Sequence, residues 1–181
     1  MRESKDNVFL AIAYIVSKLS HDGQTQHGCV IIDKEKRIVG IGYNGFPRGV
    51  NDKSLINRGY HLRPKKYPLC IHSEENAVLN CEHRPEGCTA YVTGKCCHRC
   101  LRTLWQAGIR NIICLERISN MCEDKEEQEA YNLVKEETGI SVVMVKPDLS
   151  FLLNVIRELF GLGFIHTERE IVDNQLKEFA L

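Results

Sequence analysis

Residues 71–79 read IHSEENAVL, a polar cluster that runs directly into an apolar pattern with helical spacing. Residues 97–100 read CHRC and open a second pattern of the same kind. One imidazole, from His72, and two thiolates, from Cys97 and Cys100, make a set of three zinc ligands. Three protein ligands leave one tetrahedral position open, as in catalytic rather than structural zinc sites. The two clusters therefore predict a catalytic zinc site, which the fold is expected to assemble.

Glu74 follows His72 by two positions and falls in the first turn of the predicted helix. At this offset its carboxylate is poorly placed to bind the same ion, but it can reach a water molecule on the metal as a proton carrier. Each cluster also follows a strand-like run, so the ligands are expected at the N-termini of two adjacent helices. The helix dipoles there favour thiolate over thiol. Glu74 is therefore the predicted catalytic residue.

Two non-catalytic interpretations of these residues stay open. His72 could be a buried, hydrogen-bonded histidine, with the two cysteines as reduced core thiols. The three side chains could also belong to a structural zinc clip with a fourth protein ligand. Candidates for that ligand are close in the sequence: Cys70, Cys96 and His98.

The composition indicates a globular domain without a strong charge bias. The 181 residues are 43% hydrophobic and 27% charged, which suits one domain with a substantial core. Lys+Arg and Asp+Glu both number 24, so no overall positive field favours binding to a nucleic acid polymer, and we expect none as a partner. Nine cysteines without a secretory segment at the N-terminus predict a reducing, cytoplasmic location. No apolar run has the length of a membrane span, so no membrane interaction is expected.

Hydrophobic periodicity predicts helices that alternate with strands after an initial hairpin. Helices are expected over residues 8–19, 71–81, 97–108 and 123–138, and strands over residues 29–32, 38–43, 88–93, 110–115 and 141–145. This order predicts an α/β protein with three layers, in which a mixed five-stranded sheet has helices on both faces. We expect residues 1–181 to form a single domain, with a C-terminal helical extension from about residue 148.

Two loops are candidates for ligand contact. Residues 42–49 read GYNGFPRG, and the three glycines and the proline favour a tight loop that can approach a ligand closely. An ordinary turn at a strand end is the simpler interpretation. Residues 50–68 are polar and basic without clear periodicity. Loops of this length inside a compact domain are usually functional, so this one is expected to cover a site, with one short helical turn in it.

Four stretches together resemble the deoxycytidylate (dCMP) deaminase family of the cytidine deaminase superfamily. They are GCV at 28–30, GYNGFP at 42–47, HSEENA at 72–77, and CHRC at 97–100 followed by QAGI at 106–109. The resemblance spans roughly residues 8–146 and implies the three-layer cytidine-deaminase-like fold.

The resemblance also assigns roles to individual residues. It implies that His72, Cys97 and Cys100 bind the catalytic Zn²⁺, that Glu74 shuttles the proton, and that Asn44 holds the sugar. The implied reaction is hydrolytic deamination of a deoxycytidine nucleotide, dCMP to dUMP, which supplies dUMP for thymidylate synthesis. A dCTP or C5-modified substrate is a further candidate. Family members are usually oligomers and many are regulated by nucleotides. A homo-oligomer, either a hexamer or a dimer, and Mg²⁺ bound with an allosteric nucleotide are therefore expected.

The chain departs from the family pattern at three positions. Cys96 stands where members usually have a proline, and it competes for the ligand role, but Cys97 keeps the two-residue gap to Cys100 that lets both thiolates face one ion. Glu75 replaces the usual apolar residue after the catalytic glutamate. Lys95 introduces a cation near the expected pocket and is a candidate substrate-binding residue.

Two alternative functions follow from these departures and from the wider superfamily. One is a catalytically silent regulatory homologue that binds nucleotide, although the retained Glu74 argues against silence. The other is a deaminase for another base, nucleoside or tRNA, against which the zero net charge and the GYNG stretch argue. For the phosphate of a nucleotide, solvated surface charge is the simpler interpretation of each basic candidate: Arg48, Lys95, Arg99 and Arg102.

Overall fold

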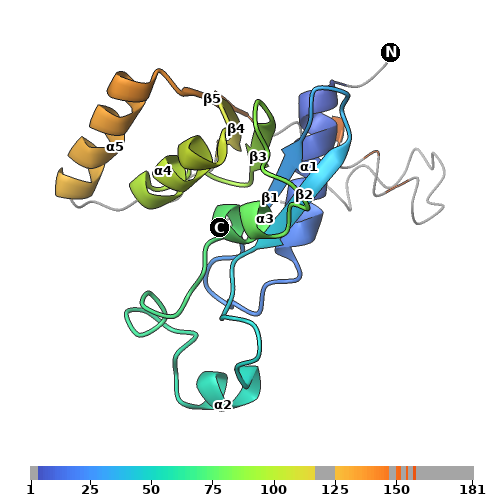
Figure 1. The fold of residues 1–181 in the computed structure, drawn as a ribbon. Helices are drawn as coiled ribbons and strands as arrows, with labels where there is room; N and C mark the ends of the chain where they lie inside the picture. Colours follow the sequence, from blue (N-terminus) through green and yellow to red (C-terminus); the bar gives the residue numbers. More distant parts are fainter. Residues whose placement is uncertain (1–3, 117–124, 147–149, 152–153, 155–156, 158–181) are drawn as a thin grey trace. The chain divides into compact units, whose positions relative to one another are not determined.

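The computed structural model describes residues 4–116, 125–146, 150, 151, 154 and 157 (Figure 1). The chain divides into two compact units, residues 1–147 and 148–181, and every element named below belongs to the first. The helices are α1 (Lys5–Ser17), α2 (Asp52–Asn57), α3 (Ser73–Leu79), α4 (His98–Ala107) and α5 (Lys125–Thr138). The strands are β1 (Gly28–Ile32), β2 (Ile38–Tyr43), β3 (Thr89–Val92), β4 (Asn111–Leu115) and β5 (Ser141–Val145).

All the predicted helices and strands up to residue 146 are present, with ends that differ by a few residues. The predicted C-terminal extension lies mostly outside the described residues. The organisation of residues 1–181 as a single domain therefore stays a prediction.

The five strands form one mixed sheet in the order β2-β1-β3-β4-β5. β1 pairs antiparallel with both β2 and β3, whereas β3, β4 and β5 are parallel to one another. Asp33 and Arg37 close the turn between β1 and β2: Arg37 Nε donates to Asp33 Oδ2 at 2.7 Å, and the Arg37 backbone N–H donates to Oδ1 at 2.8 Å. The predicted hairpin and mixed sheet are confirmed.

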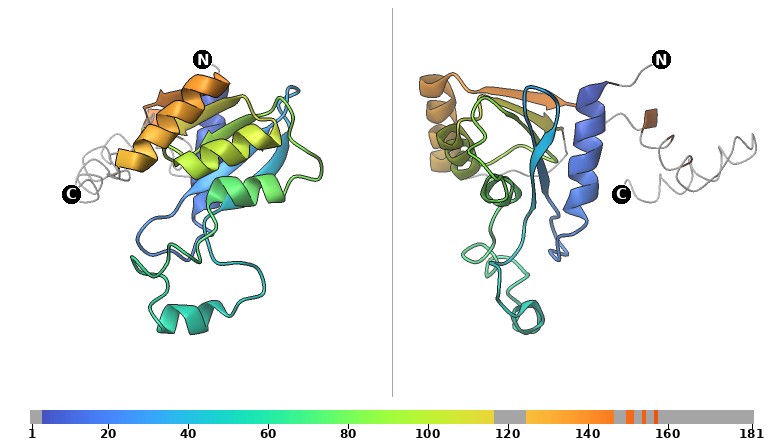
Figure 2. Two further views of the ribbon diagram at one scale, coloured as in Figure 1. Left: turned by 60° about the vertical axis from the view of Figure 1, so that its left-hand side comes forward. Right: turned by 45° about the vertical axis from the view of Figure 1, so that its right-hand side comes forward.

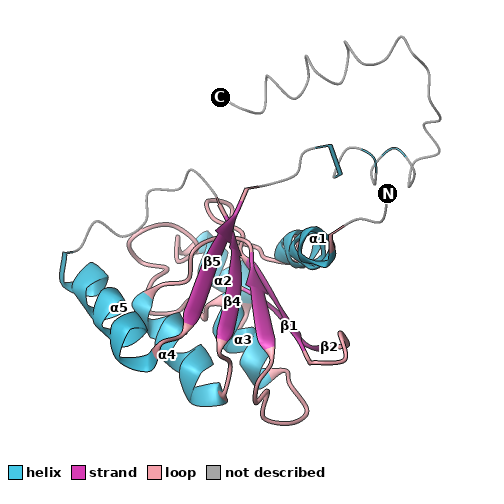
Figure 3. Ribbon diagram, turned by 90° about the horizontal axis from the view of Figure 1, so that it is seen from above, coloured by secondary structure: helices cyan, strands magenta, loops and turns pink. Residues whose placement is uncertain are grey.

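Helices cover both faces of this sheet, as the three-layer prediction required. α1 lies on one face, and α3, α4 and α5 lie on the other (Figures 2 and 3). The α1 side buries Leu10, Ala13, Val16, Val30, Ile32 and Tyr91. β1 is buried along its whole length, which explains why its sequence is continuously apolar rather than alternating. The α3 and α4 side holds a larger buried cluster that includes Leu101 and Leu104.

β2 approaches α3 closely because two of its residues lack side chains. A Cβ added at Gly42 would lie 2.3 Å from the backbone nitrogen of Ala77, and one at Gly40 would lie 2.6 Å from the Ala77 carbonyl oxygen. Both distances are far below van der Waals contact, so only glycine allows this separation of strand and helix. The contact places the first turns of α3 directly against the end of β2.

The long loop after β2 returns to the strand end from which it leaves. It contains α2, in agreement with the predicted helical turn, and Asn51 caps this helix by accepting the Ser54 N–H at 3.0 Å. Ile71 then exchanges two backbone hydrogen bonds with Gly45, at 2.8 and 3.1 Å. Residues 70–72 therefore lie beside the end of β2. Among the helices that the structure describes, none is long and apolar enough to span a bilayer.

Candidate metal centre and active site

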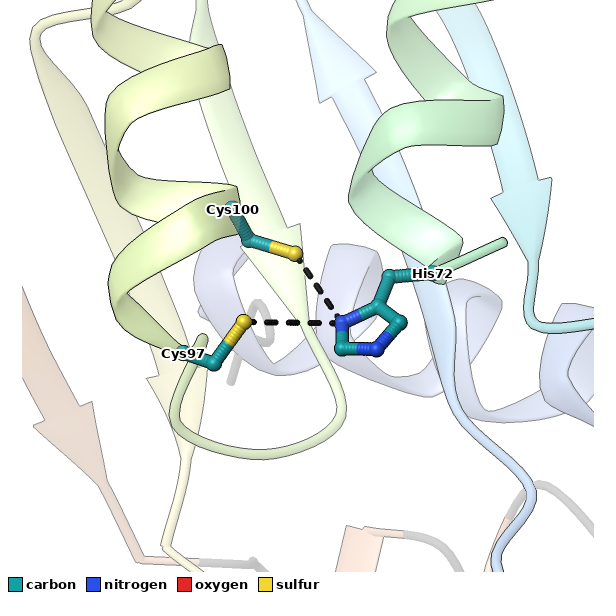
Figure 4. A group of neighbouring side chains, drawn as sticks. All are labelled: His72, Cys97 and Cys100. Carbon is teal, nitrogen blue, oxygen red and sulfur yellow. Dashed lines mark hydrogen bonds between the residues drawn. The ribbon is translucent and has the colours of Figure 1, made fainter. Parts of the chain in front are cut away.

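His72, Cys97 and Cys100 lie together at the N-termini of α3 and α4 (Figure 4). His72 Nδ1 is 3.2 Å from Cys100 Sγ and 3.5 Å from Cys97 Sγ. All three candidate ligand atoms lie within 4.8 Å of one another. The fold thus brings together, from separations of 25 and 28 residues, the three side chains that the sequence predicted as metal ligands.

Helix capping positions this trio. His72 is the N-cap residue of α3 and Cys97 is the N-cap residue of α4, while Cys100 lies buried in the first turn of α4. Glu75 Oε2 accepts the backbone N–H of His72 at 3.0 Å and so closes the first turn of α3. This departure from the family pattern therefore has a structural role, because Glu75 caps the helix that carries Glu74.

The donor set of the trio fits zinc. With Zn–N and Zn–S bonds of about 2.0 and 2.3 Å at a tetrahedral angle, nitrogen and sulfur lie about 3.5 Å apart. The observed distances of 3.5 and 3.2 Å are close to this value. Among the described residues the group has three members, which excludes the suggested fourth ligands Cys70, Cys96 and His98 from it. The arrangement favours an open, catalytic site over a four-ligand structural clip.

The close approach of the three side chains shifts their pKa values in different directions. A hydrogen bond from Cys100, with a second from His72, lowers the pKa of the Cys97 thiol to about 3 against the effect of burial. The hydrogen bond with Cys97 raises the pKa of both His72 and Cys100. Cys97 is therefore the member most easily deprotonated, and a thiolate is the form of cysteine that binds a metal.

Glu74 lies in the first turn of α3 with 5% of its surface exposed. Ser73 Oγ donates a hydrogen bond to Glu74 Oε2 at 2.8 Å. Burial raises the pKa of Glu74, and the neighbouring His72 opposes this rise. A buried carboxylate of this kind beside a metal centre is suited to accepting and returning protons.

Asn44 directly follows β2 and is buried, with both sides of its amide engaged. Nδ2 donates to the carbonyl of Thr25 at 2.9 Å and to Asp22 Oδ2 at 3.3 Å, and Oδ1 accepts the backbone N–H of His27 at 2.7 Å. A carbonyl oxygen has two lone pairs, so Oδ1 keeps one acceptor position for a ligand hydroxyl. The sugar-binding role of Asn44 stays a prediction, and this second lone pair is the group that would serve it.

Two of the basic candidates for phosphate binding, Lys95 and Arg48, contact other side chains of the protein. The Lys95 ammonium lies over the ring of Tyr131, 4.3 Å from its centroid, and donates to Gln128 Oε1 at 3.5 Å, so it faces α5. Arg48 donates a hydrogen bond to Asn80 Oδ1 at the end of α3. A role for Lys95 in binding substrate stays a prediction, and it requires the side chain to leave these partners.

One ion pair beside Asn44 was missed by the sequence analysis. Lys66 Nζ lies 2.6 Å from Asp22 Oδ2, and the two side chains are 7% and 6% exposed. Nothing in the sequence links these residues, because they are 44 positions apart and a lysine in a polar loop is normally solvated. The available signal was local: Asp22 begins a turn in which its Oδ1 accepts the N–H groups of Gln24 and Thr25, a common aspartate geometry.

A cavity of about 810 Å³ opens between α3 and α4. Its lining includes Glu75, Glu82, Arg99 and Arg102, but none of the trio and not Glu74. Arg99 and Arg102 are exposed. The cavity therefore lies beside the candidate metal centre rather than over it.

Comparison with protein families supports a deaminase assignment. The model of the family described as "Cytidine and deoxycytidylate deaminase zinc-binding region" matches residues 3–116. Deoxycytidylate deaminase of Homo sapiens is 35% identical over 136 residues, which cover 74% of this chain and 75% of the human protein. Deoxycytidylate deaminase of Mus musculus is 34% identical over 145 residues, which cover 78% and 80% of the two chains.

Solved structures share the fold. The dCMP deaminase from the cyanophage S-TIM5, in apo form, matches with a TM-score of 0.60 at 17% identity, covering 80% of this chain and all of that chain. The structure of the cyanophage enzyme in complex with dCMP and dUMP matches with a TM-score of 0.59 at 18% identity, covering 80% of this chain and 99% of that chain. At this identity the likeness establishes the three-layer architecture.

Proposed function

The chain belongs to the cytidine and deoxycytidylate deaminase family, and from this premise we propose that it converts dCMP to dUMP by zinc-dependent hydrolysis. The observation that carries the proposal is the assembly of His72, Cys97 and Cys100 with Glu74 buried beside them. The names of the relatives support dCMP as the substrate, with dCTP and C5-modified forms as the nearest alternatives. Such a reaction supplies dUMP for thymidylate synthesis.

His72, Cys97 and Cys100 would hold the zinc ion. Zinc, when bound there, supplies the Lewis acidity that makes water a nucleophile near neutral pH. Hydrolytic deamination adds the oxygen of that water to C4 of cytosine and releases the exocyclic amine as ammonia. The reaction thus requires both protons of the water to be removed, one reaching N3 and the other the leaving amine.

Glu74 is the residue proposed to move these protons. Its carboxylate takes one proton from the attacking water and delivers it to N3, and then takes the second proton from the hydroxyl group formed at C4 and delivers it to the departing amine. The Ser73 hydrogen bond to Oε2 fixes one carboxylate oxygen, so the other is the better candidate for proton transfer. One buried carboxylate therefore acts first as base and then as acid.

Asn44 is proposed to accept a hydrogen bond from a sugar hydroxyl through the second lone pair of Oδ1. A site built around such a bond discriminates strongly against ligands that lack the hydroxyl, since its buried polar group is then left unpaired. Free cytosine is therefore expected to be a poor substrate. For the phosphate we keep Lys95 as the candidate.

Finer features of the proposal rest on the resemblance alone. They are a homo-oligomer, either a hexamer or a dimer, and control by an allosteric nucleotide with Mg²⁺. The cytoplasmic location that we also propose rests instead on the nine cysteines.

The deciding experiment is to measure ammonia release from cytosine, deoxycytidine, dCMP, CMP, dCTP and their C5-substituted forms. The proposal predicts the highest kcat/KM for a deoxycytidine nucleotide. A kcat/KM for deoxycytidine equal to or above that for dCMP and dCTP would instead identify a nucleoside deaminase. Absence of turnover with every substrate, in protein that contains zinc and binds dCMP, would favour the silent regulatory homologue.

A further inference from the structure

The buried Asp22–Lys66 ion pair lies next to Asn44, which is the proposed sugar contact. Asp22 Oδ2 accepts both the Lys66 ammonium at 2.6 Å and the Asn44 amide nitrogen at 3.3 Å. Its other oxygen, Oδ1, accepts the backbone N–H groups of Gln24 and Thr25 at 2.9 and 3.0 Å. Each oxygen of the carboxylate therefore has a fixed partner set, and the side chain has one orientation that satisfies all of them.

The carboxylate helps to fix the orientation of the Asn44 amide, directly and through Thr25, whose carbonyl accepts Asn44 Nδ2 at 2.9 Å and whose N–H is bonded to Asp22. An amide presents a donor on one side and an acceptor on the other, and its two orientations are nearly equal in shape. An ionised carboxylate and a carbonyl accept hydrogen bonds and donate none, so Asp22 and the Thr25 carbonyl both favour the orientation in which Nδ2 faces them. Oδ1 of Asn44 then faces the backbone N–H of His27, which it accepts at 2.7 Å, and its second lone pair is the acceptor proposed for the sugar hydroxyl.

Lys66 keeps the carboxylate charged and in place. Burial by itself would raise the pKa of Asp22, but the hydrogen bond from Lys66 and those from the two backbone N–H groups lower it overall. An unpaired carboxylate at this depth would lose its charge or move toward water. The lysine is therefore the group that makes a buried acceptor beside Asn44 stable.

Lys66 also connects Asn44 to the segment that leads to His72. The Lys66 carbonyl accepts the N–H of Cys70 at 2.8 Å, and the following residue, Ile71, is bonded to Gly45. The pair thus fastens the chain immediately before a proposed metal ligand to the turn between α1 and β1. One ion pair therefore supports both Asn44 and the segment that leads to His72.

We propose that Lys66 and Asp22 are positioning residues that fix the amide of Asn44 and the loop before His72 for nucleotide binding. The catalytic part of this inference rests on the proposed function, because the orientation of Asn44 matters to turnover only when the substrate carries a sugar. The pair touches no reacting atom. It acts through Asn44, so its loss weakens substrate binding more than it slows the chemical step.

The experiment compares wild type with Lys66→Met, Asp22→Asn and the double variant. Each single change is expected to raise KM for dCMP by between about 10- and 100-fold, with kcat within about threefold and zinc stoichiometry unchanged, as for a misplaced binding group. The KM of the double variant for dCMP is expected to rise no further than that of the more impaired single variant, because both residues act on one amide. Lys66→Arg, which keeps a cationic donor, is expected to recover part of the KM.

Lys65 offers a matched control. It is the neighbouring lysine but is exposed, and its ammonium lies 5.8 Å from the centroid of Tyr60. Lys65→Met is expected to behave as wild type. A general loss of folded enzyme would lower the apparent kcat of Lys66→Met and leave KM unchanged, and that result, or wild-type kinetics, would overturn the proposal.

Amide hydrogen exchange gives a readout that does not depend on turnover. Lys66→Met and Asp22→Asn are expected to speed exchange at Gln24, Thr25 and His27, whose N–H groups are bonded to Asp22 or Asn44. Unchanged protection at these three amides would overturn the positioning role even if the enzyme deaminates dCMP. Faster exchange in a protein that fails to deaminate dCMP would support the positioning role and reject the proposed function separately.

Discussion

Ser73 Oγ donates a hydrogen bond to the Oε2 atom of its buried neighbour Glu74 at 2.8 Å, so the carboxylate is held within the first turn of α3. Replacing Glu74 by glutamine preserves shape and most hydrogen bonding but removes the proton carrier. We expect Glu74→Gln to lower kcat by at least about 100-fold, the usual contribution of a positioned acid–base group, while zinc content stays near wild type. Ammonia release and atomic absorption measure the two quantities. Parallel loss of zinc and activity would contradict the assigned role.

The metal ligands can be separated from the competing cysteine by substitution. His72→Ala, Cys97→Ala and Cys100→Ala are each expected to release zinc and lower the melting temperature, because metal binding stabilises the folded state. Cys96 is 1% exposed and packs in the core rather than with the trio, so Cys96→Ala should keep the metal and cost about 1 kcal/mol of stability. The zinc stoichiometry of the four variants shows which side chains bind the metal. A zinc-free Cys96→Ala protein would refute the proposed set of ligands.

Asn44→Ala removes the proposed sugar contact together with the hydrogen bonds that the Asn44 amide makes with Asp22 and with the His27 backbone N–H. Its kcat/KM for dCMP is expected to fall on the order of 100-fold or more, with no gain on free cytosine. Steady-state kinetics on both substrates measure the change. Equal relative losses on nucleotide and base would indicate a structural effect rather than a lost sugar contact.

Stability in acid should depend on Asp22. Its pKa is lower in the folded protein than the unfolded value of about 3.9, so its ionisation stabilises the fold above that pH, and the contribution is lost as pH falls through the folded pKa. Near neutral pH, Asp22→Asn breaks a buried pair and is expected to cost about 3 kcal/mol. Urea unfolding should show this difference shrinking between about pH 5 and pH 2. If the difference in free energy of unfolding between wild type and Asp22→Asn stayed constant across that pH range, Asp22 would not be the ionised partner of Lys66.

The contact between β2 and α3 should tolerate no side chain at Gly42. A Cβ there would meet backbone atoms of Ala77 and Ser73, both at 2.3 Å, so α3 must move. Gly42→Ala is expected to cost about 1–3 kcal/mol, as overpacking does, and to weaken zinc binding because His72 begins this helix. Gly23→Ala is the control, since a Cβ at Gly23 has no atom within 4 Å. Thermal unfolding and zinc titration of both variants measure the effect.

Local patterns were sufficient to predict the grouping of His72, Cys97 and Cys100, the hairpin and the order of helices and strands. These features depend on short-range spacing: a two-residue gap between Cys97 and Cys100, apolar periodicity, and a charged turn between two β-branched runs. The partners of long charged side chains were not predictable in the same way. Lys66 turns inward to Asp22 and Lys95 turns onto Tyr131, 44 and 36 positions away, because tertiary packing offers them partners that no neighbouring residue reveals.

Strand register is the remaining consequence of the close contact between β2 and α3. Side chains alternate between the faces of a strand, so a slip of one residue between β2 and β1 would turn Ile41 toward the backbone of α3, where not even a Cβ fits. Steric exclusion by the helix, in addition to apolar patterning, therefore rejects the slipped pairing. In the allowed register Tyr43 opposes Gly28, and the next residue, Asn44, donates its N–H to the carbonyl of His27 at 3.2 Å. Gly40 and Gly42 thus favour the β2–β1 register in which Asn44 reaches its hydrogen-bond partners.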